Sequence, residues 1–128
     1  MSGFSSFPTS INSALERFDF FHPEEWEKSV DWQPFHPGVQ IHRIYGDATA
    51  AAAASLLKFQ PGASIPFHAH TGYEHILVLS GSQSDEQGTM QAGRFRVNAP
   101  GTGHSVVSKD GCIVLVIYEK AVDFGDSK

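Results

Sequence analysis

Residues 62–81 decide the fold and read Gly-Ala-Ser-Ile-Pro-Phe-His-Ala-His-Thr-Gly-Tyr-Glu-His-Ile-Leu-Val-Leu-Ser-Gly. His68 and His70 alternate along the chain, so both rings project to one face if this segment is a β-strand. After a short turn that contains a glycine, Glu74 begins a largely apolar run. Two imidazoles and a carboxylate on adjacent strands can converge on one point, and they suit a divalent transition metal. The alternative is a surface loop that happens to contain histidines.

A fourth ligand candidate, His104, lies in residues 99–107, which read Ala-Pro-Gly-Thr-Gly-His-Ser-Val-Val. The Pro-Gly turn brings this histidine to the start of a β-branched stretch, where its ring could face the same interior. The predicted metal ligands are therefore His68, His70, Glu74 and His104. No catalytic or cofactor-binding residue is predicted beyond these four.

Composition and charge narrow the class of protein. The 128 residues are enough for one domain, and 41% hydrophobic against 18% charged residues indicates a folded, soluble chain. A net charge of −5 without a basic run argues against nucleic acid as a partner. No segment has the length of a membrane span or the pattern of a signal peptide, so we expect a cytoplasmic protein. The single cysteine, Cys112, is expected to fill the core.

The chain divides into an N-terminal arm, a run of short strands and a polar tail. In the arm, residues 1–30, helical turns are expected where Ile11, Leu15 and Phe18 recur and again from Pro23. Short strands between Gly- and Pro-containing turns follow and predict an all-β sandwich or barrel. The strands are expected at 39–45, 50–59, 67–70, 74–79, 89–91, 94–98, 103–108 and 112–119.

Three segments of this assignment rest on weaker signals. Ala50–Ala54 has high helix propensity, yet it runs directly into an apolar stretch that ends at a Pro-Gly turn, so we expect a strand. The polar residues 81–88 are expected to form a loop. The tail, residues 123–128, is expected to fray.

The two histidine segments resemble the signature motifs of the cupin superfamily. The first motif, G-x5-H-x-H-x3-E-x6-G, is met at every position by Gly62, His68, His70, Glu74 and Gly81. The second, G-x5-P-x-G-x2-H-x3-N, is met loosely, since Pro100 directly precedes Gly101 and Ser108 replaces the final Asn. The resemblance implies a cupin double-stranded β-helix, or jelly-roll barrel, over residues 31–122.

Residues 30–120 resemble the ChrR-like cupins in particular. The shared marks are His-x-His-x-Gly-x-Glu at 68–74, Ser-Asp-Glu-x-Gly at 84–88 and Gly-Cys at 111–112. That branch includes oxygenases that cleave acetylacetone or dihydroxyacetophenone, and the cupin half of ChrR-type anti-sigma factors. The sequence has no counterpart of the Cys/His set in the zinc-binding helical domain of those factors.

The resemblance implies a metal-dependent dioxygenase, or a related small-molecule enzyme, that acts on a dicarbonyl compound or an aromatic ketone. The alternative is a non-catalytic metal-holding sensory or regulatory module. One divalent metal ion is expected; Fe(II) is favoured, and Zn, Mn, Ni and Cu also suit nitrogen and oxygen ligands. The expected partners are a small-molecule substrate or ligand and a second copy of the chain, held through the apolar arm.

The pocket around the metal is predicted from strand parity. Ile76, Val78 and Val106 share the parity of the ligands and are expected to line it. Four further apolar residues could add to its walls but are expected in the core: Phe59, Phe67, Met90 and Phe95. Arg94 and Arg96 share one face; if that face is inward they could pair with a carboxylate substrate, and otherwise they face solvent. The remaining histidines and Tyr73 are not expected in the site.

Overall fold

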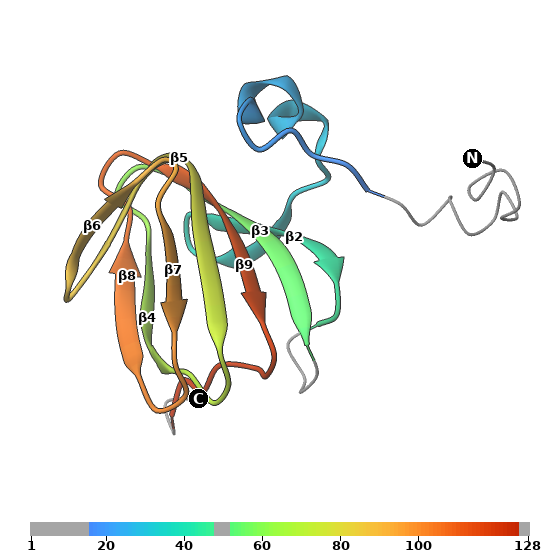
Figure 1. The fold of residues 1–128 in the computed structure, drawn as a ribbon. Coiled ribbons are helices and arrows are strands. Elements are labelled where there is room, and N and C mark those ends of the chain that lie inside the picture. Colours follow the sequence, from blue (N-terminus) through green and yellow to red (C-terminus); the bar gives the residue numbers. More distant parts are fainter. Residues whose placement is uncertain (1–15, 48–51, 126–128) are drawn as a thin grey trace, which may run out of the picture.

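The computed structural model describes residues 16–47 and 52–125, and it is an antiparallel β-sheet that curls on itself (Figure 1). This confirms the all-β prediction. The strands are β1 (Gln33–His36), β2 (Val39–Tyr45), β3 (Ala53–Phe59), β4 (Ser64–Ala69), β5 (Glu74–Asp85), β6 (Gly88–Gln91), β7 (Phe95–Asn98), β8 (Gly103–Val107) and β9 (Cys112–Tyr118). Two short 3-10 helices, η2 (Pro23–Glu25) and η3 (Glu27–Ser29), precede them.

The long strand β5 joins the two walls of the barrel. The sheet order is β1-β2-β3-β9-β5-β8-β4, and β6 and β7 also pair with β5. The first half of β5 pairs with β9 and β7, and its second half pairs with β6 and β8. A register shift between Val78 and Ser80 marks the change. Since a bulge bends a strand, β5 can serve both walls without a break in the chain.

The core fills the inside of the curl. Alternate residues of β5, β2 and β9 point inward, as period-2 strands require, and among the most deeply buried are Val39, Val78 and Val114. A second, smaller cluster lies on the outer side of the sheet, where Leu56, Leu79 and Ile113 are covered by Phe18 and Trp26 of the arm and by Trp32, which follows it. The arm therefore packs against the barrel.

The alanine run forms a strand, as expected, because β3 is buried on both faces. Ala53 and Ala54 are both nearly inaccessible, and β3 pairs along its length with β2 and β9. Tertiary packing overrides helix propensity here. Ala50 and Ala51 lie outside the described residues, as do Ile11 and Leu15 of the first expected helical turn.

The prediction of a loop over residues 81–88 was wrong. Strand β5 runs through Asp85, and β6 begins at Gly88, so only a tight turn separates them. Polar composition misled the assignment, because Ser82 and Gln83 are polar residues that are nevertheless buried, and Gln83 lines the interior cavity. From the sequence alone, a polar side chain buried inside a barrel cannot be distinguished from one that faces solvent.

The chain after β9 does not fray at its start, contrary to the expectation for the tail. Asp123 exchanges both backbone hydrogen bonds with Ala69, at 2.7 and 2.8 Å. Phe124 packs against the core, with its ring centroid 5.4 Å from that of His68. Phe67 and Phe95, which were expected in the core, are each 60% exposed. Among the described residues, no helix is long and apolar enough to cross a membrane.

Replacement of Gly81 by alanine should destabilise the protein strongly. Gly81 has a φ of 70°, and an ideal Cβ there would lie 1.9 Å from the carbonyl oxygen of Gly111. Gly62 is the matched control, since its φ is 84° but no atom lies within 4 Å of its Cβ position. In urea unfolding, Gly62→Ala should lose about 1–2 kcal/mol from backbone strain alone, and Gly81→Ala clearly more, because the steric clash adds to that strain. Equal losses would contradict the packing described at Gly81.

Candidate metal centre

The structure brings the four predicted ligands together. His68 lies on β4, His70 directly after it, Glu74 begins β5, and His104 lies on β8; all four are buried. His68 and His104 are paired residues of neighbouring strands, so the register places them side by side. One ligand atom from each of the four residues lies within 4.8 Å of the others. This group could hold a metal ion, and the assignment of the four as ligands stays a prediction.

The Nδ1 atom of each histidine is already engaged on the side away from the cluster. The His68 Nδ1 atom lies 3.0 Å from the Pro66 carbonyl oxygen, and the His104 Nδ1 atom lies 2.8 Å from Asp85 Oδ2. The His70 Nδ1 atom lies 2.9 Å from Thr102 Oγ1, whose own hydroxyl donates to the Ala99 carbonyl oxygen. Each of these three oxygen atoms can accept a hydrogen bond from the ring, which favours the tautomer with the proton on Nδ1. The Nε2 atoms are then left with free lone pairs, as metal ligands require.

The donor atoms inside the cluster fit a cation. His70 Nε2 lies 2.9 Å from Glu74 Oε1, yet it is buried and has no hydrogen-bond partner among the described residues. His104 Nε2 lies 3.8 Å from the same oxygen. A buried group without a partner is costly. Three neutral imidazoles and one carboxylate carry a charge of about −1, which a divalent ion offsets.

Electrostatics keep the site in the state that binds metal. Burial lowers the pKa of His68, which favours its neutral form. Burial also acts to raise the pKa of Glu74, but the contact with His70 and the hydrogen bond from Asn98 outweigh it, so the pKa of this carboxyl lies below its usual value. Asn98 Nδ2 donates to Glu74 Oε1 over 3.1 Å. Glu74 is therefore an ionised ligand at neutral pH.

A chain of polar contacts supports the ligands from outside. Asp85 accepts from His104 and forms an ion pair with Arg96. The Arg96 Nε atom in turn donates to Asn98 Oδ1 over 3.0 Å, and Asn98 holds Glu74. Burial acts to raise the pKa of Asp85, yet Arg96 and His104 lower it to about 2. Asp85 thus stays a carboxylate and holds the His104 ring in orientation.

Sequence reasoning missed most of these supporting residues. Asp85 belongs to the Ser-Asp-Glu-x-Gly segment but was assigned to a loop, and Thr102 was read only as part of a turn. Asn98 pairs directly with Glu74 across β7 and β5, so the parity of the strand at 94–98 could have indicated it. Arg96 shares that face and is bound to Asp85 and Asn98, whereas Arg94 is exposed. Neither arginine lines the apolar cavity inside the barrel, whereas Arg96 lines a separate pocket together with His70 and His104.

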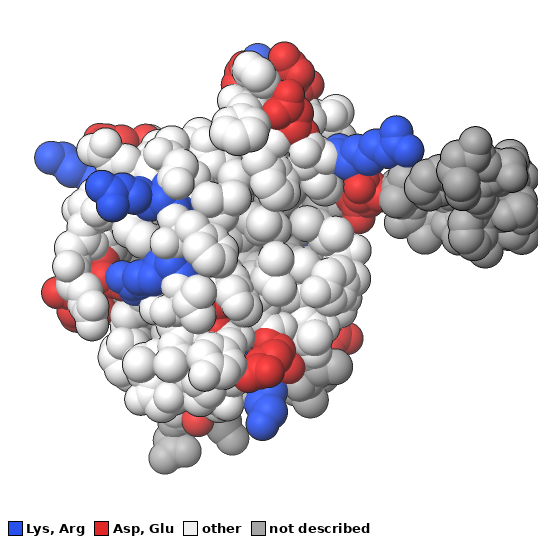
Figure 2. All heavy atoms as spheres, in the orientation of Figure 1, with Lys and Arg blue, Asp and Glu red and all other residues white. Residues whose placement is uncertain are grey.

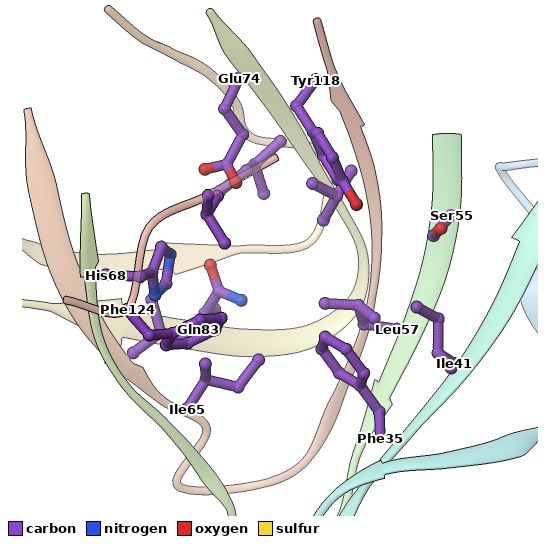
Figure 3. A pocket seen from close by; sticks show the side chains of 14 residues that line it. Phe35, Ile41, Ser55, Leu57, Ile65, His68, Glu74, Gln83, Tyr118 and Phe124 are labelled. Atoms are coloured by element: carbon purple, nitrogen blue, oxygen red, sulfur yellow. The ribbon is translucent and has the colours of Figure 1, made fainter. Parts of the chain in front are cut away.

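The cluster opens into a cavity inside the barrel (Figure 3). About 70 Å³ of it is open to the centres of water-sized molecules. Ile76 and Val106 line it, as parity predicts, while Val78 lies in the core and not on the cavity wall. The walls are mostly apolar, and their residues are Phe35, Ile41, Ser55, Leu57, Ile65, His68, Glu74, Ile76, Gln83, Val106, Val116, Tyr118, Val122 and Phe124.

The other candidates lie away from the cluster. The His42 ring points outward and pairs with Glu16 at 2.8 Å, and the His75 ring stacks on Phe95. Tyr73 is 48% exposed. On the face shown in Figure 2, acidic and basic side chains are scattered over a mostly uncharged surface, and no large basic area is visible.

Known proteins share this architecture. The ChrR cupin-like domain family matches residues 27–122. No protein of curated function matches the chain. A cupin-like protein of unknown function from Ralstonia eutropha JMP134 has 22% identity and a TM-score of 0.58 over 64% of this chain; the chain covers 55% of that protein's length.

Two further solved structures are similar in fold. A complex of SigE with the anti-sigma ChrR from Rhodobacter sphaeroides matches over 92% of this chain and 74% of its own, with 22% identity and a TM-score of 0.66. A putative acetylacetone dioxygenase from Methylibium petroleiphilum PM1 matches over 88% of this chain and 83% of its own, with 14% identity and a TM-score of 0.71. With the family match, these likenesses confirm the predicted cupin fold.

Loss of His104 should abolish stoichiometric metal binding. Wild-type protein supplied with iron should retain about one ion per chain, since four donors converge there. His104→Ala should retain at most a tenth of that after gel filtration, measured by elemental analysis. His75→Ala is the control, because His75 is next to Glu74 in sequence but its ring stacks on Phe95 outside the cluster. Full metal content in His104→Ala would contradict the assignment.

Asp85→Asn should weaken metal binding without removing a ligand. The substitution keeps the shape but removes the carboxylate that holds the His104 ring, and loss of such a partner costs about 10- to 100-fold in metal affinity. Glu86→Gln is the control, because the neighbouring Glu86 is an exposed carboxylate that binds Ser105 and touches no ligand. Affinities would be compared by competition with a chelating dye. Equal affinity for both variants would show that Asp85 does not support the site.

Proposed function

The chain belongs to the ChrR cupin-like domain family, and on that premise we propose that it is a metal-dependent dioxygenase for a small dicarbonyl compound or aromatic ketone. The observation that carries this proposal is the position of two residues of the cluster, His68 and Glu74, on the wall of a mostly apolar cavity. A metal held only for structure needs no such space beside it. A small organic molecule in this cavity would lie directly against the ligands.

The ligand set favours Fe(II). Three histidines and one glutamate come close to the two-histidine, one-carboxylate arrangement of non-haem iron oxygenases. Bound there, iron would supply redox chemistry and coordination positions that the protein does not fill. Zn, Mn, Ni and Cu accept the same donors, so the ligand set alone does not select iron.

The protein's own residues prepare the cavity for such a substrate. Apolar side chains such as Ile76 and Val106 exclude bulk water from the space beside the cluster. Tyr118 lines the cavity, and burial raises the pKa of its hydroxyl, so this group stays protonated and able to donate a hydrogen bond. Glu74 stays ionised through its contacts with His70 and Asn98. The pocket thus offers one negative ligand and neutral surroundings.

The second candidate is a non-catalytic metal-holding sensory or regulatory module. It is favoured by the restricted cavity, in which Val122 and Phe124 from the end of the described chain form part of the wall. The likeness to the complex of SigE with ChrR extends over 92% of this chain and is compatible with such a role. In this case the cavity would bind a signal molecule without converting it. The homodimer and the cytoplasmic location stay predictions under both candidates.

Oxygen uptake tests the dioxygenase proposal. Iron-loaded protein, offered acetylacetone or dihydroxyacetophenone in an oxygen electrode, should consume one molecule of dioxygen per molecule of substrate. Mass spectrometry with labelled dioxygen should find both oxygen atoms in the cleavage products. Zinc-loaded protein and iron-supplied His104→Ala are the controls, and both should be inactive. No uptake by protein with stoichiometric iron would reject the dioxygenase and leave the non-catalytic module.

A further inference from the structure

Three uncharged polar side chains on the cavity wall have no hydrogen-bond partner within the described chain. They are the Ser55 hydroxyl on β3, the Gln83 carboxamide on β5 and the Tyr118 hydroxyl on β9. Ser55 is only 3% exposed and Gln83 only 5%. In Figure 3 the Gln83 carboxamide projects into the cavity, and Ser55 lies on the wall away from His68. The metal cluster uses none of the three.

Buried polar groups of this kind are normally satisfied. A donor or acceptor that faces an interior space is costly to leave without a partner, so native proteins rarely leave one unpaired. The three groups line a space that admits water-sized molecules, so their partners are whatever occupies that space. An apolar residue in place of Gln83 would fill this position without leaving a polar group unpaired. The glutamine therefore indicates that the cavity binds a molecule with hydrogen-bonding atoms.

The cavity wall also shows which charge the occupant carries. No lysine or arginine is among the described residues that line it, and Arg96 is bound to Asp85 and Asn98 outside it. A carboxylate or phosphate away from the metal would therefore be buried without a counter-charge, which is strongly unfavourable. A hydroxyl or carbonyl group would instead meet neutral donors and acceptors.

We infer that Gln83, with Ser55 and Tyr118, selects ligands that are uncharged away from the metal and carry a hydroxyl or carbonyl oxygen there. This inference rests on the metal centre of the proposed function and narrows its substrate class to neutral oxygenated molecules. Gln83 is a specificity-determining residue in this assignment. Its carboxamide both donates and accepts hydrogen bonds, so it can bind either a hydroxyl or a carbonyl oxygen of the ligand.

The test uses zinc-loaded protein, so that binding is measured without turnover. Three hydroxamates of equal chain length provide the same metal-binding end: butanohydroxamate, 4-hydroxybutanohydroxamate and the monohydroxamate of succinate. Their far ends are a methyl group, a hydroxyl group and a carboxylate. By calorimetry, the hydroxyl compound should bind wild-type protein about threefold more tightly than the methyl compound, and at least about tenfold more tightly than the carboxylate.

Gln83→Leu should remove the preference for hydroxyl over methyl while leaving binding of the methyl compound intact. Gln91→Leu is the matched control, because it changes an exposed glutamine of the adjacent strand β6 and should keep the wild-type preference. Thermal unfolding would confirm that both variants are folded. Ser55→Ala, a smaller change on the opposite wall, provides a second variant with a reduced hydroxyl preference if Gln83→Leu does not fold.

The outcomes separate this inference from the dioxygenase proposal. Equal or tighter binding of the carboxylate compound by wild-type protein would overturn the inference, as would a hydroxyl preference that survives in folded Gln83→Leu. Failure of all three compounds to bind would also overturn it, since the metal would then not open into the cavity. Oxygen uptake without hydroxyl selectivity would reject the inference alone, and selectivity without oxygen uptake would reject the dioxygenase alone.

Discussion

Four electron-pair donors are held inside a curled sheet, and this repulsive arrangement is the constraint on which the rest of the structure depends. The Nε2 atoms and the Glu74 carboxylate approach within 4.8 Å of one another. The outward contacts of the Nδ1 atoms with Pro66, Thr102 and Asp85 favour protons on Nδ1 and leave lone pairs on the inward nitrogens. A cation would satisfy all four together. The β4–β8 register and the start of β5 keep the donors in place in spite of this repulsion.

Strand β5 connects the metal, its support and the cavity. It begins with the ligand Glu74, passes through the core at Val78, and ends with Gln83 on the cavity wall and Asp85 behind His104. Because one continuous strand carries all four, a change in its register would displace the ligand and both polar contacts at once. The bulge after Val78 allows this single strand to cross from one wall of the barrel to the other.

The sequence predicts which four side chains converge, but it predicts the residues around them poorly, for a physical reason. His68 and His70 alternate, and His104 follows a Pro-Gly turn, so local rules suffice to place them on inward faces. Gln83 and Asn98 are polar residues in a protein interior. Predictions from the alternation of polar and apolar residues place polar side chains in solvent, so they miss both residues. Their roles depend on which strands become neighbours, and that information is not local. For the same reason, the end of β5 was predicted to be a loop.

The pairing of Asp123 with Ala69 gives the end of the described chain a mechanical connection to the metal. Ala69 stands between His68 and His70, and both of its backbone groups are bound to Asp123, while Phe124 lies against the His68 ring. A displacement of this segment would be transmitted through a single residue to two ligands. If the cluster holds a metal ion, a fluorophore attached beyond Phe124 would therefore act as a reporter of its occupancy. An affinity tag at the same end would, for the same reason, risk disturbing the cluster in the protein that it helps to purify.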